Sequence, residues 1–285
     1  MVSPSLSRIK DIFRPASENA LRSLLKEYKS EAELIAGGTD LLVKPEAEVK
    51  YLIDLSGVGL DYLKAEDEWI LIGAMTNVSS LISCEFFDKD PHRIVKSAAS
   101  VFGTMQTRNR ATIGGNICSA VPSADLPIAL IALDAQVEIA GDENRTMLLE
   151  DFLTGYRQTA LEEHEYLREI RISRHGDKSR SAFQKLCRTS VDLALVNCAV
   201  RLNSSSSFRD SRIVLGAVAP TPIRARNAER RMDESQVIDK DLISDVSDLA
   251  SRETKPISDV RASAEYRRAM SKVLVDRALK QALGW

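Results

Sequence analysis

Two pairs of adjacent glycines, each directly after an apolar segment, constrain this chain more than any other feature of its sequence. The first lies in residues 34–41 (LIAGGTDL) and the second in residues 111–117 (ATIGGNI). Because glycine lacks a Cβ, such a loop can approach a pyrophosphate closely, and several backbone N–H groups can converge on its oxygens. Gly-Gly pairs are also common in plain turns, so their spacing alone leaves both interpretations open.

The polar neighbours of the glycines favour a dinucleotide as the ligand. The hydroxyls of Thr39 and Thr112 can donate hydrogen bonds to a pyrophosphate. Asp40 and Asp125 would repel it, so we expect these carboxylates to accept hydrogen bonds from backbone N–H groups or from the hydroxyls of a ribose or ribityl chain. The alternative is that both aspartates are caps.

Other nucleotide and metal motifs do not occur in the sequence. Gly57 and Gly59 have G-x-G spacing without a third glycine, and there is no G-x-x-x-x-G-K-[ST] stretch. The four cysteines are widely spread and none forms a C-x-x-C pair, which argues against a zinc or iron–sulfur site. We therefore expect no metal in this chain and four reduced thiols in or near the core.

Charge and apolar-run length exclude two classes of partner. The net charge is −2, from 39 basic and 41 acidic residues, so the chain as a whole is not attracted to nucleic acid. The longest apolar run, residues 126–133, is far shorter than the about 20 residues that span a bilayer. Residues 1–17 lack the basic and apolar stretches of a signal peptide. These features predict a cytoplasmic protein without a membrane span.

Apolar periodicity predicts an α+β protein of two or three lobes, since 285 residues exceed what one core commonly supports. Within the glycine-rich stretch at 103–116, the second glycine pair (residues 111–117) is interpreted as a loop, and the serines at 204–207 as a hairpin tip. Helices are expected over 16–29 with Ser17 as N-cap, from the capping Thr76 to 82, and over 94–101 and 262–283. Strands are expected over 33–36, 51–55, 69–72, 136–140, 166–173, 182–187, 193–202 and 213–218.

Residues 99–125 (ASVFGTMQTRNRATIGGNICSAVPSAD) and 36–40 (AGGTD) resemble the two flavin-binding segments of the medium subunit in the xanthine dehydrogenase and carbon monoxide dehydrogenase family. The likeness extends in order over nearly the whole chain, which makes it far more specific than either glycine pair. The cysteine spacing excludes the 4-hydroxybenzoyl-CoA reductase branch, which carries a cysteine-rich loop. Further similar positions are 72–74, 125–127, 133–135, 151–152, 183–186, 219–222 and 261–267.

The resemblance implies a two-lobed FAD-binding fold of the vanillyl-alcohol-oxidase type, followed by a smaller α/β C-terminal domain in which helices pack on a sheet. Its implied boundaries are residues 1–57 for FAD-binding lobe 1, 58–176 for FAD-binding lobe 2 and 177–285 for the C-terminal domain. FAD would lie extended between the two lobes, without a covalent bond to the protein.

The resemblance also implies which residues contact FAD. Phe102 could instead be a core aromatic, and Lys185 a surface lysine on an exposed strand. His92, His164 and His175 lie in charged, loop-like surroundings and are expected to be solvated. The implied cofactor-binding residues are Leu34, Ile35, Ala36, Gly37, Gly38, Thr39, Asp40, Leu41, Phe102, Thr112, Ile113, Gly114, Gly115, Asn116, Asp125 and Lys185.

The function that the resemblance implies is electron transfer. A molybdenum cofactor on one partner subunit would oxidise the organic substrate, and 2Fe-2S clusters on another would pass the electrons to FAD on this chain, for delivery to NAD or another acceptor. Xanthine or another purine is the first substrate hypothesis. No catalytic acid or base is expected here, and the partners should require an exposed apolar or mixed patch. Two rivals are a stand-alone FAD-dependent oxidase or reductase of the same fold and a non-enzymatic α/β binding module.

Overall fold

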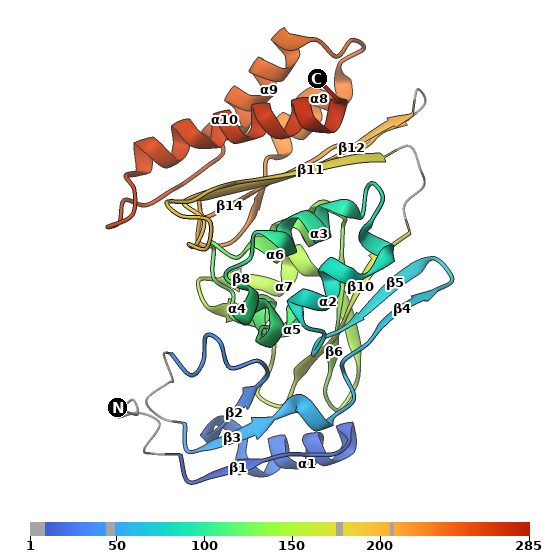
Figure 1. Ribbon diagram of the computed structural model, residues 1–285, viewed down its shortest axis with the longest axis vertical. Helices are drawn as coiled ribbons and strands as arrows, with labels where there is room; N and C mark the ends of the chain where they lie inside the picture. The colour runs from blue at the N-terminus through green and yellow to red at the C-terminus, as the bar shows by residue number, and fades with distance from the viewer. Residues whose placement is uncertain (1–8, 44–48, 175–178, 206–207) are drawn as a thin grey trace.

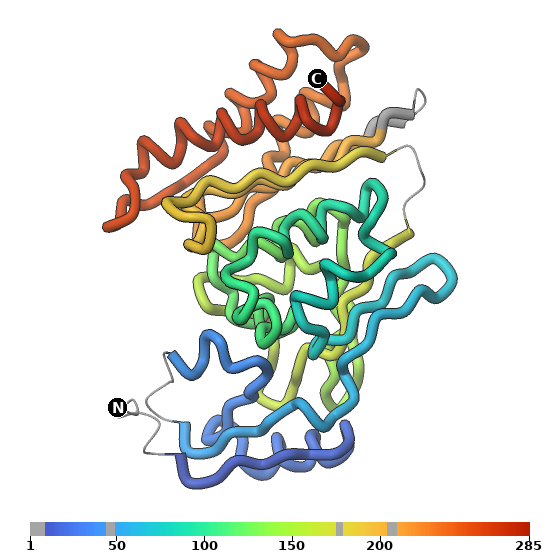
Figure 2. Tube along the Cα trace, in the orientation of Figure 1, coloured from blue at the N-terminus to red at the C-terminus, as the bar shows by residue number. Residues whose placement is uncertain are grey.

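The computed structural model describes residues 9–43, 49–174, 179–205 and 208–285. Three groups of helices and strands are stacked along the long axis of the molecule (Figures 1 and 2). The N-terminal group lies at one end, the C-terminal group at the other, and the middle group between them contacts both. The middle group therefore forms one junction with the N-terminal group and one with the C-terminal group, and residues from all three groups can meet at a single site.

The N-terminal group is a small parallel sheet covered by one helix, α1 (Glu18–Tyr28). The Ser17 hydroxyl accepts a hydrogen bond from the backbone N–H of Ala20, which confirms the predicted N-cap. Leu21 and Leu25 on the buried face of α1 pack against the sheet, as their spacing predicts. The strands are β1 (Asp11–Phe13), β3 (Tyr51–Asp54) and β2 (Ala32–Ile35), in that order across the sheet. The 3₁₀ turn η2 (Lys29–Glu31) precedes β2, and η3 (Leu55–Gly57) follows β3.

The middle group is an antiparallel sheet with short helices packed on it. Its strands, in spatial order, are β4 (Leu63–Glu66), β5 (Trp69–Gly73), β10 (Tyr166–Ser173), β6 (Gln136–Ala140) and β7 (Arg145–Leu148). Its helices are α2 (Val78–Ser83), the 3₁₀ turn η4 (Glu85–Phe87), α3 (Arg93–Ser100), α4 (Met105–Arg110), α5 (Ile113–Cys118), α6 (Asp125–Ala132) and α7 (Leu149–Phe152). A separate hairpin pairs β8 (Leu153–Gly155) with β9 (Gln158–Thr159).

Most of the glycine-rich stretch of the middle group is helical, so the prediction of a glycine loop over residues 111–117 is wrong from Ile113 onward, where α5 begins. The Thr104 side chain caps α4, and the Thr112 hydroxyl caps α5 by accepting from the N–H of Gly115. The second cap stabilises a helix that its two glycines disfavour. The predicted start of α2 at Thr76 is also wrong, because the buried Thr76 hydroxyl donates to the carbonyl of Tyr62 and Asn77 precedes the helix.

The C-terminal group contains an antiparallel sheet. Helices of the middle group cover one face of this sheet, and helices of the C-terminal group cover the other. Alternating strand residues face opposite sides: Phe183 and Ala199 join the core of the middle group, whereas Ala182, Cys198 and Leu215 pack under the C-terminal helices. The strands are β11 (Ser179–Leu186), β12 (Val196–Ser205), β14 (Arg212–Gly216) and β15 (Ile223–Arg224), with β13 (Phe208–Arg209) paired to β12. The helices are α8 (Arg226–Glu234), α9 (Lys240–Arg252) and α10 (Ala264–Leu283).

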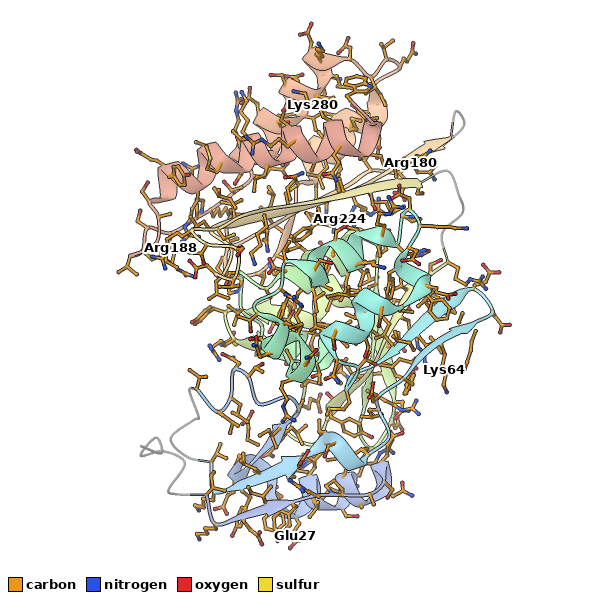
Figure 3. The ribbon with its side chains drawn as sticks, in the orientation of Figure 1. Glu27, Lys64, Arg180, Arg188, Arg224 and Lys280 are labelled. Atoms are coloured by element: carbon orange, nitrogen blue, oxygen red, sulfur yellow. The ribbon has the colours of Figure 1, made fainter. Side chains whose placement is uncertain are left out.

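The junction between the middle and C-terminal groups is both apolar and charged. All eight residues of α6 are buried, because this helix lies against β12 and β14 as well as against its own group. Figure 3 shows Arg224 at this junction. Its guanidinium pairs with Glu229 at 2.7 Å and approaches Glu150 at 3.6 Å, while the buried Arg201 pairs with Asp134 at 2.6 Å. The two groups are thus joined over a broad surface.

Two further predictions can be compared with these elements. Ser204 and Ser205 belong to β12, while residues 206–207 of the predicted hairpin tip lie outside the described residues. No helix in the described part of the chain is long and apolar enough to cross a membrane.

Candidate functional site

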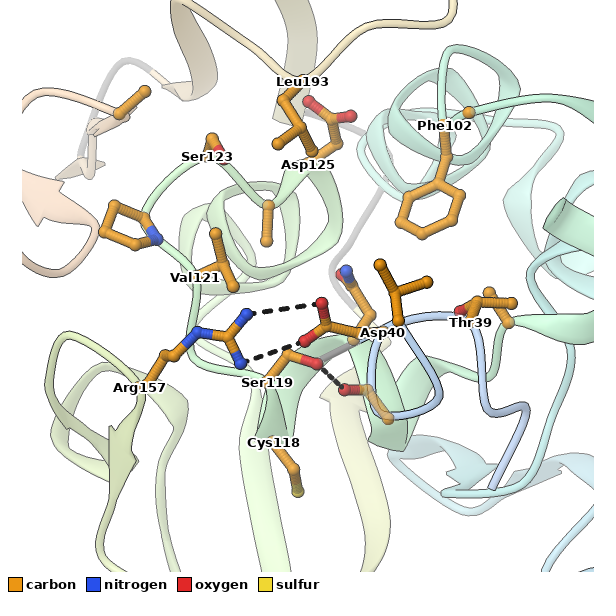
Figure 4. Close-up of a pocket in the computed structure, with 18 of the residues that line it drawn as sticks. Thr39, Asp40, Phe102, Cys118, Ser119, Val121, Ser123, Asp125, Arg157 and Leu193 are labelled. Carbon is orange, nitrogen blue, oxygen red and sulfur yellow. Dashed lines mark hydrogen bonds and ion pairs between the residues drawn. The ribbon is translucent and has the colours of Figure 1, made fainter. Parts of the chain in front are cut away.

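A cavity of about 910 Å³ lies where the three groups meet (Figure 4). Its volume is at the upper end of the range of about 300–1,000 Å³ that is typical of cofactor sites. The loop after β2 lines one side, and the segments around α4, α5 and the start of α6 line another. The C-terminal group contributes Lys185, Val191, Asp192, Leu193, Ala217, Ala219, Pro220, Lys255, Ile257, Asp259, Arg261 and Arg267. All the predicted cofactor-binding residues line this cavity except Ile35, Ile113 and Gly114.

The first glycine pair lets the loop after β2 lie directly on the middle group. A Cβ on Gly37 would be 1.9 Å from the carbonyl oxygen of Arg110, so only glycine permits this backbone contact. Gly38 has a φ of +71°, a left-handed conformation that a side chain would strain. The first pair therefore shapes the loop and brings it against the end of α4.

The two glycines of the second pair have different surroundings. A Cβ on Gly114 would be 2.7 Å from both the Cβ and the carbonyl oxygen of Ala74, which packs against it from the middle group. Gly115 faces the cavity, where a Cβ would meet the Thr112 hydroxyl at 3.0 Å and the Cβ of Ala36 at 3.7 Å. Of this pair, Gly115 is the position at which a ligand can approach the backbone.

The residues at this meeting point fit a dinucleotide such as FAD. The side-chain oxygen of Asn116 is buried and has no hydrogen-bond partner in the described part of the chain, and an unsatisfied buried acceptor calls for a ligand donor or a water. The Thr112 hydroxyl accepts from Gly115, and it can still donate its own hydrogen. Phe102 lines the cavity and also packs against the core, so its position is compatible with either interpretation of this residue.

A buried ion pair forms the wall of the cavity toward the C-terminal group. Lys185 on β11 contacts Asp125 at the start of α6 at 2.7 Å, and their side chains are 4% and 6% exposed. Lys185 also donates to the carbonyl of Val101, and Asn197 on β12 donates to the other Asp125 oxygen at 2.8 Å. Burial raises the pKa of the Asp125 carboxyl, while Lys185 and Asn197 act in the opposite direction. Lys185 is therefore not an exposed surface lysine.

A second ion pair crosses the cavity between the N-terminal and middle groups. Asp40 and Arg157 face each other with two contacts, 3.2 Å to one guanidinium nitrogen and 3.3 Å to the other (Figure 4). Arg157 lies in the turn between β8 and β9, a segment without any glycine-loop or nucleotide motif, and the sequence offered no reason to select it. Asn197 was missed as well, because an asparagine inside an apolar strand carries no recognisable spacing.

Histidines and cysteines contribute no metal site to the described residues, since no three potential metal ligands cluster there. The expectation that His92 is solvated is wrong: the ring is buried, and Nε2 lies 2.9 Å from the carbonyl oxygen of Ser173. His175 is outside the described residues. All four cysteines are free, and burial raises the pKa of the Cys118 thiol, on the cavity wall, to about 12. That thiol is protonated at neutral pH.

Large hydrophobic side chains surround the cavity on the outer surface. They come from all three groups of the molecule, so the apolar area is not a property of one element. Exposed apolar side chains of this kind are common at protein–protein interfaces, and the patch expected for partner subunits stays a prediction. Its residues, each exposed and each lining the cavity, are Val43, Tyr156, Val191, Leu193 and Ile257.

Known proteins match the chain over its full length. The family model described as FAD binding domain in molybdopterin dehydrogenase matches residues 7–174, and that of the CO dehydrogenase flavoprotein C-terminal domain matches residues 181–282. The carbon monoxide dehydrogenase medium chain of Hydrogenophaga pseudoflava is 33% identical, over 94% of this chain and 95% of that one. The xanthine dehydrogenase FAD-binding subunit of Escherichia coli O157:H7 is 27% identical, over 89% of each chain.

A solved structure extends this likeness to three dimensions. In a carbon monoxide dehydrogenase structure from Hydrogenophaga pseudoflava, one chain superposes with a TM-score of 0.93 and 32% identity, over 100% of this chain and 99% of that one. The predicted fold and FAD as cofactor are thereby confirmed, with molybdenum and iron–sulfur cofactors assigned to other subunits. The chain belongs to the family of FAD-binding medium subunits of molybdopterin dehydrogenases.

Proposed function

We propose that this chain is the electron-transfer subunit of a molybdenum hydroxylase complex and that it holds FAD in the cavity between its three groups. The observation that carries the proposal is the convergence of both glycine pairs and the unsatisfied Asn116 oxygen on one cavity of cofactor size. Bound FAD would supply the ability to accept electrons singly from iron–sulfur clusters and to pass them on in pairs.

The residues of the chain would bind FAD mainly through backbone and small polar groups. Gly38 permits the left-handed turn of the loop that lines the cavity, and Gly115 leaves the backbone accessible from it. Asn116 and Thr112 offer an acceptor and a donor beside Gly115. The predicted residues Ile35, Ile113 and Gly114 do not line the cavity. We propose that these three act from behind, by fixing the position of the loop after β2 and of the start of α5.

The Lys185–Asp125 pair would set the electrostatic environment of the flavin. Both charges are withdrawn from water and each is satisfied by the other and by neighbouring groups, so they stay in place while electrons arrive and leave. Fixed charges of this kind act strongly in a site that excludes water. We propose that the C-terminal group is therefore part of the flavin site and not an appendage to it.

The charged side chains around the cavity support electron transfer over stand-alone catalysis. Asp125 pairs with Lys185, Asp40 with Arg157, and Asp259 with two arginines. A stand-alone oxidase or reductase would need an acid, a base or a recognition cluster directed at its own substrate. Its test is flavin reduction by an organic substrate in the absence of any partner chain.

Substrate and acceptor belong to the finer part of the proposal. Xanthine or another purine stays a prediction that the comparisons do not favour, since the carbon monoxide dehydrogenase chain is 33% identical and the xanthine dehydrogenase chain 27%. NAD as acceptor also stays a prediction, and no G-x-G-x-x-G motif supports it. We propose that the substrate pocket lies on the molybdenum subunit, and that the exposed hydrophobic residues around the cavity contact a partner subunit.

The first experiment is a visible absorption spectrum of the purified chain, followed by heat denaturation and analysis of the released nucleotide. The proposal expects flavin bands near one FAD per chain, or their appearance when FAD is added, and full release on denaturation. The electron-transfer step is then tested by mixing the loaded chain with its iron–sulfur and molybdenum partners and following flavin reduction. A chain that stays colourless with added FAD would contradict the proposal.

A further inference from the structure

The exposed ion pair between Asp40 and Arg157 spans the cavity beside the first glycine pair. Asp40 belongs to the loop after β2, and Arg157 to the turn between β8 and β9, so the pair joins two lobes across the site (Figure 4). The Arg157 side chain is 39% exposed and that of Asp40 is 45% exposed. Both side chains line the cavity. The pair is thus accessible to whatever the cavity binds.

The backbone holds Arg157 in an unusual conformation at this place. Its φ is +54°, in the left-handed region that residues other than glycine rarely occupy. Its N–H donates to the carbonyl of Ala120 at 3.0 Å, which ties the turn to the chain just after α5. Tertiary contacts therefore impose the position from which the guanidinium reaches the glycine loop. A side chain placed at such a conformational cost is a candidate for function.

A cation beside the glycine loop would stabilise a bound pyrophosphate further. The pyrophosphate of FAD is a dianion, while the loop offers neutral N–H groups and the carboxylate of Asp40, which repels it. Lys185 is buried and bound to Asp125, and Arg261 and Arg267 are bound to Asp259. Lys255, the remaining described cation that lines the cavity, lies on the C-terminal group, whereas Arg157 directly contacts the glycine loop.

We propose that Arg157 supplies the countercharge for the pyrophosphate of bound FAD, with Asp40 orienting its guanidinium. The inference rests on the proposed binding of FAD and adds a residue that the glycine loops and the family resemblance did not identify. A guanidinium has five N–H donors, so it can hold the carboxylate through some of them and a phosphate oxygen through another. The pair is exposed and weak, so it can rearrange when an anion arrives.

The test compares ligands with and without the pyrophosphate on the full-length chain. FAD and riboflavin are titrated by flavin fluorescence into the unsubstituted chain, Arg157→Met and Arg157→Lys. We expect Arg157→Met to weaken FAD binding by about ten- to a hundredfold, as for the loss of a charged hydrogen bond, with riboflavin affinity unchanged. Arg157→Lys should recover part of the affinity, and FAD binding to Arg157→Met should depend less on salt.

A matched control is Arg231→Met, which removes a guanidinium of similar exposure from an ion pair with Asp245 on the C-terminal helices. It should leave both affinities unchanged. Equal or tighter FAD binding by Arg157→Met would overturn the inference, and so would an equal loss of FAD and riboflavin affinity, because that indicates general damage to the site. If the unsubstituted chain binds neither ligand, the proposed function itself fails and the inference falls with it.

Discussion

Two ion pairs border the same cavity, and they differ in almost every physical respect. The Lys185–Asp125 pair joins the C-terminal and middle groups, is almost fully buried, and has further hydrogen bonds to Val101 and Asn197. The Asp40–Arg157 pair joins the N-terminal and middle groups and is more than a third exposed on both sides. One pair belongs to the interior of the protein and the other to the opening of the site.

This difference gives the cavity one fixed wall and one wall that can adapt to a ligand. Breaking a buried pair leaves an uncompensated charge, which costs about 3–5 kcal/mol, whereas an exposed pair contributes about 0–1 kcal/mol. The buried pair therefore holds the C-terminal wall of the cavity in place. The exposed pair can exchange its contacts for those of a ligand at small cost. Four experiments test this contrast between the fixed and the adaptable wall.

The largest effect is expected for Lys185→Met, which leaves the Asp125 carboxylate buried without its cation. The free energy of unfolding in urea should fall by about 3–5 kcal/mol, and the chain should retain little flavin after purification. Adding Asp125→Asn to this variant should restore part of the stability, because the unpaired charge is then removed. An unchanged unfolding midpoint in Lys185→Met would show that the buried pair does not hold the wall.

The next effect distinguishes the buried Gly114 from the two glycines that line the cavity, Gly115 and Gly38. Gly114→Val places side-chain atoms against Ala74 and should cost about 1–3 kcal/mol of stability, as overpacking does. Gly115→Val and Gly38→Val should instead abolish FAD retention with a modest loss of folding stability. Urea unfolding and flavin content measure the two properties. Full flavin content in both cavity-side variants would remove these glycines from the site.

A pH series tests the carboxyl of the buried pair. Burial raises the pKa of Asp125 above its unfolded value, so the folded state binds the proton more tightly. The resulting contribution to stability is present below the unfolded pKa of about 3.9 and is lost as the pH rises through the folded pKa. Compared with Asp125→Asn, the unsubstituted chain should therefore lose unfolding free energy as the pH is raised from about 4. Parallel curves for the two proteins would contradict this effect.

The smallest effect is expected at the exposed pair. In the absence of flavin, Asp40→Asn and Arg157→Met should each change the free energy of unfolding by no more than about 1 kcal/mol. Urea denaturation of the flavin-free chains measures this. A loss as large as that of Lys185→Met would mean that the exposed pair holds the lobes together, and the contrast between the two pairs would disappear.

Local patterns predicted much of the fold. The apolar spacing and the Ser17 cap predicted α1, and alternating apolar residues predicted most of the longer strands close to their observed bounds. These predictions succeeded because capping and periodicity act over a few residues. The prediction for the glycine-rich stretch failed for the same reason. Its composition favours a loop, but the hydroxyls of Thr104 and Thr112 cap two short helices there.

The family, the cofactor and the two glycine-containing segments could be identified from the order of residue types along the chain. The burial of Lys185 against Asp125, the support of the same carboxylate by Asn197 and the contact of Arg157 with Asp40 became visible only in the folded molecule. Each of these contacts joins residues at least 60 positions apart. Such pairs depend on how the groups of the fold pack against one another, and no local pattern of residues records that packing.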